Sequence, residues 1–421
     1  MNRRITRLTV GLAVAFAVLM VQLTNLGYFS AEQLRRHELN QRAVTAFGAP
    51  RGAIVSADGE TIAPALIPTE AEPRPTRTYP HGPLYAHTAG YFALTPGVVG
   101  GLERHYNAEL SGSATDIAID ELADLFRDAH RVGDLNLTLH HGVQLTARAA
   151  LGDWDGSVVV VVPTTGEILA LWSRPSFDPN KVETWAPDSP TTNSGMPPAS
   201  AYRRHYGLAG ATTSDAASAD LLAGASRASG RTGIDLPGEP DAVAASAGVP
   251  LTPLQLAMAA ASVANGGVRM RPYVVHSVGV RTTMHPDGGE PAGTGALPAT
   301  MPQAAGRLFE TDDASELLAR MAAQARQASI SLAPADGVEI PAAIAAGLLS
   351  DPAAGGTRTG SWAVLVAPPD APTVVVAVVI EPDTTLDVAE PQGGGTLAAM
   401  IAATAAEATL ALRAVSDPDR P

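Results

Sequence analysis

The chain has 421 residues, of which 46% are hydrophobic and 5% aromatic, and its formal net charge is −14. This length predicts two or three domains, and the negative charge argues against a general role on nucleic acid or on an anionic membrane surface. The absence of cysteine excludes disulfides, thiol nucleophiles and cysteine metal sites.

The first thirty residues predict a membrane anchor. Arg3, Arg4 and Arg7 precede an uncharged apolar run from Leu8 to Phe29. At about 1.5 Å per residue this run can cross a bilayer core of about 30 Å, and the arginines place its start in the cytoplasm. A cleavable signal peptide is the alternative, but its apolar stretch is normally shorter and ends in small residues. We therefore expect residues 1–29 to be a single-pass anchor and the rest to be extracytoplasmic.

Short elements follow, and we assign them to one small β-rich domain over residues 30–133. Ser30 followed by Gln33 is a capping box, and the turn residues Asp58-Gly59 between two apolar stretches are typical of a β-hairpin. The elements expected are a helix over 30–41, a hairpin over 50–63, an extended proline-rich linker over 64–78 and a helix over 100–112 that ends at Gly112.

From residue 134 the elements become longer. Thr252 followed by Pro253 predicts a helix start, because threonine is a good N-cap and proline suits the first helical position. The elements expected are strands over 135–140, 157–162, 168–173, 362–367 and 373–380, helices over 141–151, 253–264, 313–327 and 396–413, and a mobile loop over 282–303. Hairpins at both ends with helices between them predict an α+β domain over 134–421, an antiparallel sheet covered by helices.

Several stretches, in this order behind one anchor, resemble the class B penicillin-binding proteins of actinobacteria, the peptidoglycan D,D-transpeptidases of septation and elongation. They are PRGAIVSADGETIA (50–63), TYPHGPLYAHTAGYF (78–92), GGLERHYNAELSG (100–112), PTTGEILALWSRPSFDPN (163–180), GRTGIDLPGEP (230–240), TPLQLAMAAASVANGGVRMRPYVV (252–275) and the final hairpin with its helix. The resemblance implies an N-terminal pedestal or dimerisation-like domain and a C-terminal transpeptidase/β-lactamase-like domain. It also implies three catalytic motifs: S-x-x-K, S-x-N and K-T-G.

In the first motif, a serine attacks the carbonyl of a D-Ala-D-Ala stem, and a lysine one helical turn later takes its proton. The family's approach to this motif appears here as PPASAYRR, which aligns Ser200 with the nucleophile and Arg203 with the lysine. Arginine stays protonated and cannot be a general base. Ser200 is equally explained as a helix N-cap after Pro197-Pro198, and we favour that interpretation.

The best candidate for S-x-N is Ser214-Asp215-Ala216, only fourteen residues after Ser200. The family has several tens of residues there, so the helical subdomain near 204–230 is expected to be shortened. Ala216 cannot replace the asparagine amide. Asp215 can in principle act as a base, but we favour an ordinary aspartate at a helix start.

The third motif has two alignments. Counting back from the strand at Trp362 puts Leu348, Leu349 and Ser350 at K-T-G, which in the family binds the substrate carboxylate and helps to form the oxyanion hole. The second alignment, Arg358-Thr359-Gly360-Ser361, keeps a cation but leaves no room for a turn before the Trp362 strand. We favour the first alignment and treat Arg358 as a loop residue near the groove.

The remaining candidates are a lysine and several histidines. Lys181 is the only lysine and lies outside all three motifs, so a mechanism that needs two lysines is excluded. His205 follows Arg203 by two residues, about 200° around a helix, and so does not face Ser200. His140, His141 and His276 lack metal-ligand spacing. We expect no metal and no cofactor.

Three hypotheses follow. The first is a transpeptidase homologue without catalysis, which acts as a partner or scaffold in the peptidoglycan synthesis machinery, since the family's anchor and pedestal contact a polytopic glycosyltransferase. The second is an active serine D,D-transpeptidase that uses Ser200 with His205 or Asp215 as base and Arg358 for the substrate carboxylate. The third is an extracytoplasmic module that binds stem peptides or muropeptides without covalent chemistry.

Overall fold

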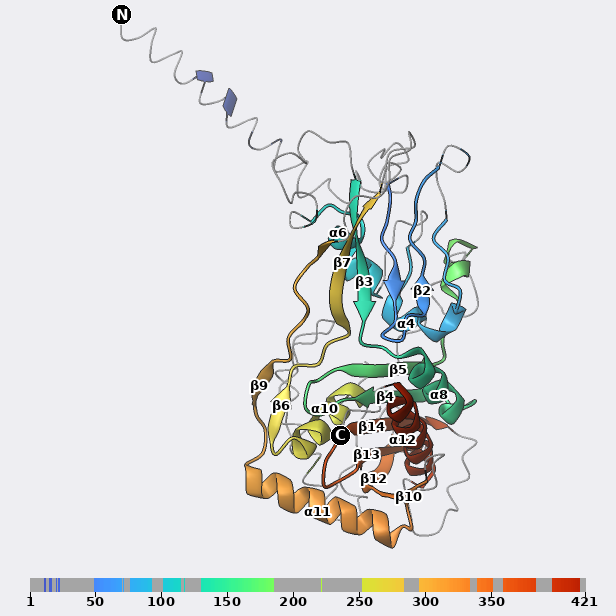
Figure 1. Cartoon of the computed structure of the whole chain (residues 1–421), viewed down its shortest axis with the longest axis vertical. Coiled ribbons are helices and arrows are strands. Elements are labelled where there is room, and N and C mark those ends of the chain that lie inside the picture. The colour runs from blue at the N-terminus through green and yellow to red at the C-terminus, as the bar shows by residue number, and fades with distance from the viewer. Residues whose placement is uncertain are drawn as a thin grey trace, which may run out of the picture. The chain divides into compact units, whose positions relative to one another are not determined.

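The structure is a computed structural model, and it describes residues 11–12, 15–16, 20, 22, 49–69, 71, 76–92, 101–114, 117, 130–184, 221, 252–283, 295–333, 339–350, 359–383 and 396–416. The chain divides into two compact units, Met1–Ala49 and Pro50–Pro421. The second unit contains all the strands that are described, and they form two five-stranded sheets and two two-stranded sheets (Figure 1).

The first sheet is mixed and has the order β2-β1-β3-β7-β8. Its strands are β1 (Ile54–Val55), β2 (Thr61–Ala63), β3 (His130–Leu137), β7 (Val275–Thr283) and β8 (Gly295–Ala296). The hairpin predicted over 50–63 is confirmed as the antiparallel pair β1 and β2, while β1 is parallel to β3. The prediction of a loop over 282–303 is wrong in part, because β8 pairs with β7 at Gly279 and Val280.

Short helices cover this part of the chain: η2 (Gly82–Leu84), α4 (Ala86–Ala89), α5 (Gly101–His105) and α6 (Asn107–Leu110). The helix predicted over 100–112 is thus two helices. They end before Gly112, whose φ of 68° and contact with the Arg131 carbonyl leave no room for a side chain.

The prediction of a linker over 64–78 is wrong at both ends of that stretch. The backbone of Leu66 pairs with that of Arg51, and the side chains of Leu66 and Arg77 are buried. These residues are therefore packed parts of the N-terminal region. The prolines between them favour an extended backbone, but they do not determine whether the residues on either side pack against the rest of the chain.

The second sheet is fully antiparallel and has the order β12-β13-β14-β4-β5. Its strands are β4 (Gly156–Val161), β5 (Ile168–Arg174), β12 (Ala343–Ser350), β13 (Thr359–Ala367) and β14 (Val374–Asp383). Every residue of β4 is buried. Strands with continuous apolar runs are buried on both faces, which explains why they show no alternation of apolar and polar residues.

Three helices complete this core: α8 (His141–Leu151), α10 (Pro253–Ala264) and α12 (Thr396–Ser416). α8 and α12 pack on each other and on β5, β13 and β14, while α10 packs on β4, β13 and β14. The predicted start of α10 is confirmed: Thr252 and Gln255 form a capping box, with hydrogen bonds of 3.1 and 2.9 Å.

The remaining elements lie around this sheet. They are η4 (Pro179–Thr184), β6 (Val268–Met270), β9 (Ala304–Arg307), α11 (Thr311–Gln327), β10 (Ser331–Leu332) and β11 (Ile340–Pro341). α11 packs against the edge strand β12 and against α10. The α+β fold predicted from the sequence, with an antiparallel sheet and covering helices, is confirmed.

The membrane anchor predicted over residues 1–29 lies mostly outside the described residues. Among those that are described, one helix is long and apolar enough to cross a membrane, the stretch Leu397–Ala414 of α12. Because α12 packs on β13, β14 and α8, its apolar residues serve the core of the domain. The helix predicted over 30–41 and the segment near 204–230, which is predicted to be shortened, lie outside the described residues, apart from Leu221.

Candidate functional site

The two alternative positions for the third motif lie side by side in the sheet. Leu348, Leu349 and Ser350 form the end of the edge strand β12, and Thr359 to Ser361 begin β13 beside it. The register pairs Leu348 with Ser361 and Ser350 with Thr359. The residues that the first alignment assigns to K-T-G therefore lie in a strand, as that alignment predicts.

The other proposed catalytic residues fall outside the described part of the chain. These are Ser200, Arg203, His205, Ser214, Asp215, Ala216 and Arg358. Their assignment remains a prediction from the sequence. The described end of the site consists of β12, β13 and the helices packed on them, with Gly360 and Ser361 buried at the start of β13.

Lys181 lies near the edge of the sheet that is opposite to β12. It belongs to η4, which follows β5, and β5 is at the opposite edge from β12. Its side chain is 73% exposed, and its ammonium group lies 3.7 Å from the carboxylate of Asp178. Lys181 therefore does not supply a cation to the β12 edge.

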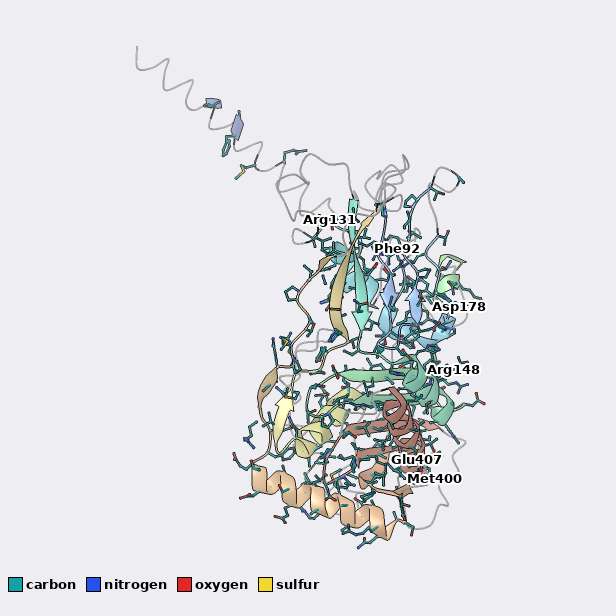
Figure 2. All side chains as sticks on the ribbon, in the orientation of Figure 1. Phe92, Arg131, Arg148, Asp178, Met400 and Glu407 are labelled. Atoms are coloured by element: carbon teal, nitrogen blue, oxygen red, sulfur yellow. The ribbon has the colours of Figure 1, made fainter. Side chains whose placement is uncertain are left out.

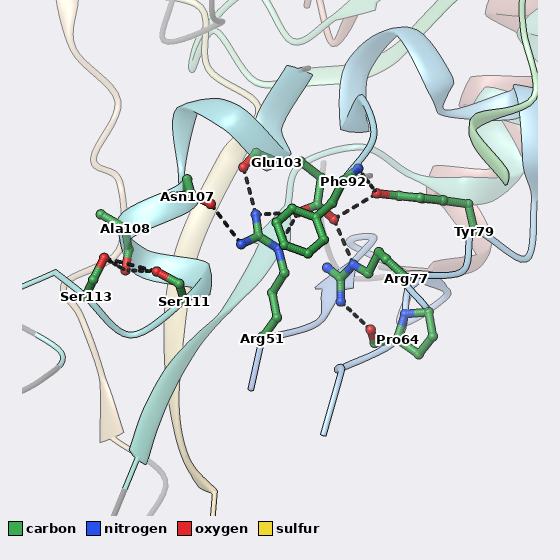
Figure 3. A network of polar contacts seen from close by, with 10 residues as sticks. All are labelled: Arg51, Pro64, Arg77, Tyr79, Phe92, Glu103, Asn107, Ala108, Ser111 and Ser113. Carbon is green, nitrogen blue, oxygen red and sulfur yellow. Dashed lines mark hydrogen bonds and ion pairs between the residues drawn. The ribbon is translucent and has the colours of Figure 1, made fainter. Parts of the chain in front are cut away.

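A buried ionic network joins three of the stretches on which the resemblance depends (Figure 3). Glu103 is fully buried and binds two guanidinium groups, Arg51 at 2.6 Å and Arg77 at 2.8 Å. The Tyr79 hydroxyl donates to Glu103 at 3.2 Å, and Arg51 also donates to Asn107. Burial opposes ionisation of Glu103, but the charges and hydrogen bonds of Arg77 and Arg51 outweigh it and lower the pKa of this carboxyl.

Sequence reasoning did not predict this network. Arg51 and Glu103 are each part of a recognisable stretch, but Glu103 is followed by Arg104 and His105, so no local pattern marks it as buried. Because the partners are 26 and 52 residues apart along the chain, only the fold brings them together.

Further contacts attach the N-terminal stretches to the second sheet. The side chain of Asn180 bonds both the backbone N–H and the carbonyl of Tyr79, at 2.9 and 3.0 Å. Asp58, in the turn of the first hairpin, accepts hydrogen bonds from the backbone of His141 and Gly142 and so caps α8. These hydrogen bonds lower the pKa of Asp58, although partial burial opposes the effect. A helix N-terminus favours such a carboxylate.

The described residues offer no arrangement for a metal, since no group of three or more His, Asp or Glu side chains within them can hold one. What they provide is an antiparallel sheet whose edge strand β12 has the sequence AIAAGLLS, with only small, apolar and hydroxyl residues. Such an edge can pair with an extended peptide through its backbone, but it supplies no charged group.

Two sequence profiles match the chain. Residues 51–135 match the penicillin binding protein A dimerisation domain, and residues 225–407 match the penicillin binding protein transpeptidase domain. The second match begins beyond Ser200 and Ser214, so it does not include the positions aligned with the first two motifs.

Among curated proteins, the peptidoglycan D,D-transpeptidase PbpA of Mycolicibacterium smegmatis is 35% identical over 192 residues, 44% of this chain and 38% of that relative. PbpA of Mycobacterium tuberculosis is 28% identical, and the alignment spans 90% of this chain and 94% of the relative. That alignment is 486 positions long, more than the whole of this chain, and so it contains long gaps.

The fold is also that of solved structures. Penicillin-binding protein A from M. tuberculosis, as its imipenem acyl-enzyme complex, has a TM-score of 0.64 at 22% identity, with 87% of this chain and 100% of that chain covered. The D,D-transpeptidase domain of a peptidoglycan glycosyltransferase from Eggerthella lenta has a TM-score of 0.58 at 20% identity, with 87% and 100% covered.

The fold and both profile matches define a transpeptidase-type domain preceded by a dimerisation-type domain. The chain belongs to the penicillin-binding proteins of class B.

Proposed function

We propose that this protein takes part in peptidoglycan synthesis without transpeptidase catalysis, as a partner or scaffold of the membrane synthesis complex. The observation that carries the proposal is the composition of β12. The strand aligned with K-T-G reads AIAAGLLS and contains no lysine or arginine. A substrate carboxylate at this edge therefore lacks the cation that the family motif supplies.

The lysine count supports the same conclusion. Transfer of the serine proton requires a group that can be deprotonated near neutral pH, and arginine is not one. Arg203 stands where the family has its lysine, and Lys181 is exposed beyond β5. The match to the transpeptidase profile from residue 225 onward is in keeping with loss of the first two motifs.

Other observations support a scaffold role in the membrane. Residues 51–135 match the dimerisation-domain profile, and the ionic network that organises them is intact. In the first unit, Leu12, Phe16 and Met20 are helical and expose 74, 65 and 53% of their surfaces, in keeping with a single-pass anchor. The partner that the resemblance suggests is a polytopic glycosyltransferase, with the C-terminal domain outside the cytoplasm.

A fluorescent penicillin tests the loss of catalysis. We expect the full chain in membranes to show no covalent labelling, and Ser200→Ala to be indistinguishable from the unchanged protein. A labelled M. tuberculosis PbpA in the same membranes is the positive control. Labelling that disappears in Ser200→Ala would establish an active serine enzyme instead. In the same preparation, we expect both forms to co-purify with the glycosyltransferase, since Ser200 has no part in that contact.

A further inference from the structure

A pocket lies at the opposite edge of the sheet from β12. It has a volume of about 520 Å³ and is formed by the C-terminal half of α8, the residues that follow it, and β5. Leu145 and Ala149 supply apolar surface, and Arg148, Asp153 and Arg174 supply charge. Its size is that of a small-molecule site, with a few polar groups converging on an apolar surface.

Two residues that line this pocket have a polar group without a protein acceptor among the described residues. The guanidinium of Arg148, on α8 (Figure 2), lies over the ring of Trp172 at 5.7 Å. Within the described part of the chain it has no carboxylate at ion-pair distance. The indole N–H of Trp172 is buried and has no hydrogen-bond partner there, and the residue is only 5% exposed. A buried donor without an acceptor is costly, so an acceptor that reaches this N–H when a ligand binds gains a hydrogen bond.

A second guanidinium can turn to the same ligand at little cost. Arg174 lies 3.4 Å from Asp153 and 3.3 Å from Asp155. The two carboxylates are 105% and 55% exposed, and ion pairs of this exposure contribute little to stability. Arg174 is therefore able to exchange one of these partners for a bound acceptor, and the released Asp153 can accept from a ligand hydroxyl or amide.

We propose that this pocket binds a carboxylate-bearing fragment of the size of one sugar ring or two amino-acid residues. Two guanidinium groups and an indole N–H are the donors that a carboxylate requires, because the guanidinium fork matches its two oxygens. Leu145 and Ala149 contact the apolar part of the ligand, and Asp153 orients its polar part. The shared chemistry is a carboxylate beside hydroxyl or amide groups, which both acidic sugars and short peptides carry.

This inference does not depend on the proposed loss of catalysis. The pocket is at β5, and the aligned catalytic motif is at β12, on the other edge of the same sheet. A purely structural role for Arg148, in which it complements the C-terminal end of α8, predicts a change in stability but none in ligand affinity. Ligand titration therefore separates the two roles.

The test titrates the full chain in detergent with N-acetylmuramic acid, with N-acetylglucosamine as the matched sugar that lacks the carboxylate, and with D-alanyl-D-alanine as the peptide arm. Isothermal titration calorimetry or ligand-observed NMR measures the affinity. We expect millimolar or tighter binding for at least one of the two carboxylates and at least about tenfold weaker binding of N-acetylglucosamine. Which carboxylate binds more tightly identifies the source of the ligand.

Variants connect the binding to this pocket. Arg148→Gln is an exposed substitution and is expected to weaken binding about tenfold or more, while Arg148→Lys retains part of it. Trp172→Phe removes the indole donor and is expected to weaken binding as well. Arg326→Gln, an exposed arginine on α11, is the matched control and leaves the affinity unchanged. No binding of either carboxylate, equal binding of the two sugars without binding of D-alanyl-D-alanine, or full affinity in Arg148→Gln would overturn the proposal.

Discussion

At the scale of single residues, Glu103 has the largest expected effect on stability. It is fully buried between the guanidinium groups of Arg51 and Arg77. Removing one member of a buried ionic network leaves uncompensated charge, which costs about 3–5 kcal/mol. We therefore expect Glu103→Gln to lower the free energy of unfolding by about 3 kcal/mol, measured by urea denaturation. Glu316→Gln, an exposed partner of Arg320, is the control and should change it by less than about 0.5 kcal/mol.

The same residue predicts a dependence on pH. The pKa of Glu103 is lower in the folded chain than in the unfolded chain, since Arg77 and Arg51 outweigh the effect of burial. Its contribution is therefore fully present above the unfolded pKa of about 4.3 and is lost as the pH falls through the folded value. Urea denaturation across the acid range should show a steeper loss of stability in the unchanged protein than in Glu103→Gln. Identical slopes would mean that folding leaves the pKa of Glu103 unchanged.

At the scale of elements, the side chain of Gln144 in α8 pairs with backbone groups of the edge strand β5. Its buried side chain donates to the carbonyls of Leu171 and Leu84 and accepts from the N–H of Leu171, at 2.8–3.0 Å. The side chain thus makes hydrogen bonds to Leu171 of the kind that a neighbouring strand would make. Gln144→Leu keeps the volume but leaves buried backbone groups unpaired, so we expect a loss of about 3 kcal/mol in the free energy of unfolding. A change below about 1 kcal/mol would show that other groups satisfy this edge.

The elements themselves were largely predictable. α8 has the residues expected from periodicity, and α10 has those expected from its capping signals, because both signals are local. β8 and the packed ends of the 64–78 stretch were not predictable. The pairing of β8 with β7 and of Leu66 with Arg51 depends on partners that lie elsewhere in the chain.

At the scale of the molecule, the segment Pro50–Pro421 is one compact unit, although two profiles match it. Asn180 binds Tyr79, Asp58 caps α8, and Thr138 donates to the carbonyl of Ile168, so hydrogen bonds connect the N-terminal region to α8 and the second sheet. We expect this segment, expressed without residues 1–49, to unfold in a single calorimetric transition. Two resolved transitions would show that the two regions fold independently.

The sequence by itself determined the order of the elements, the family, and the chemical types at each motif position: one lysine in the whole chain and no cation in the strand AIAAGLLS. These properties are local or compositional and need no partner. Only the tertiary structure decided which distant residues meet. It placed Leu348 beside Ser361, put Lys181 beyond the opposite edge of the sheet, and surrounded Glu103 with two arginines. Register and burial come from contacts between segments far apart in sequence, and short-range patterns carry no information about them.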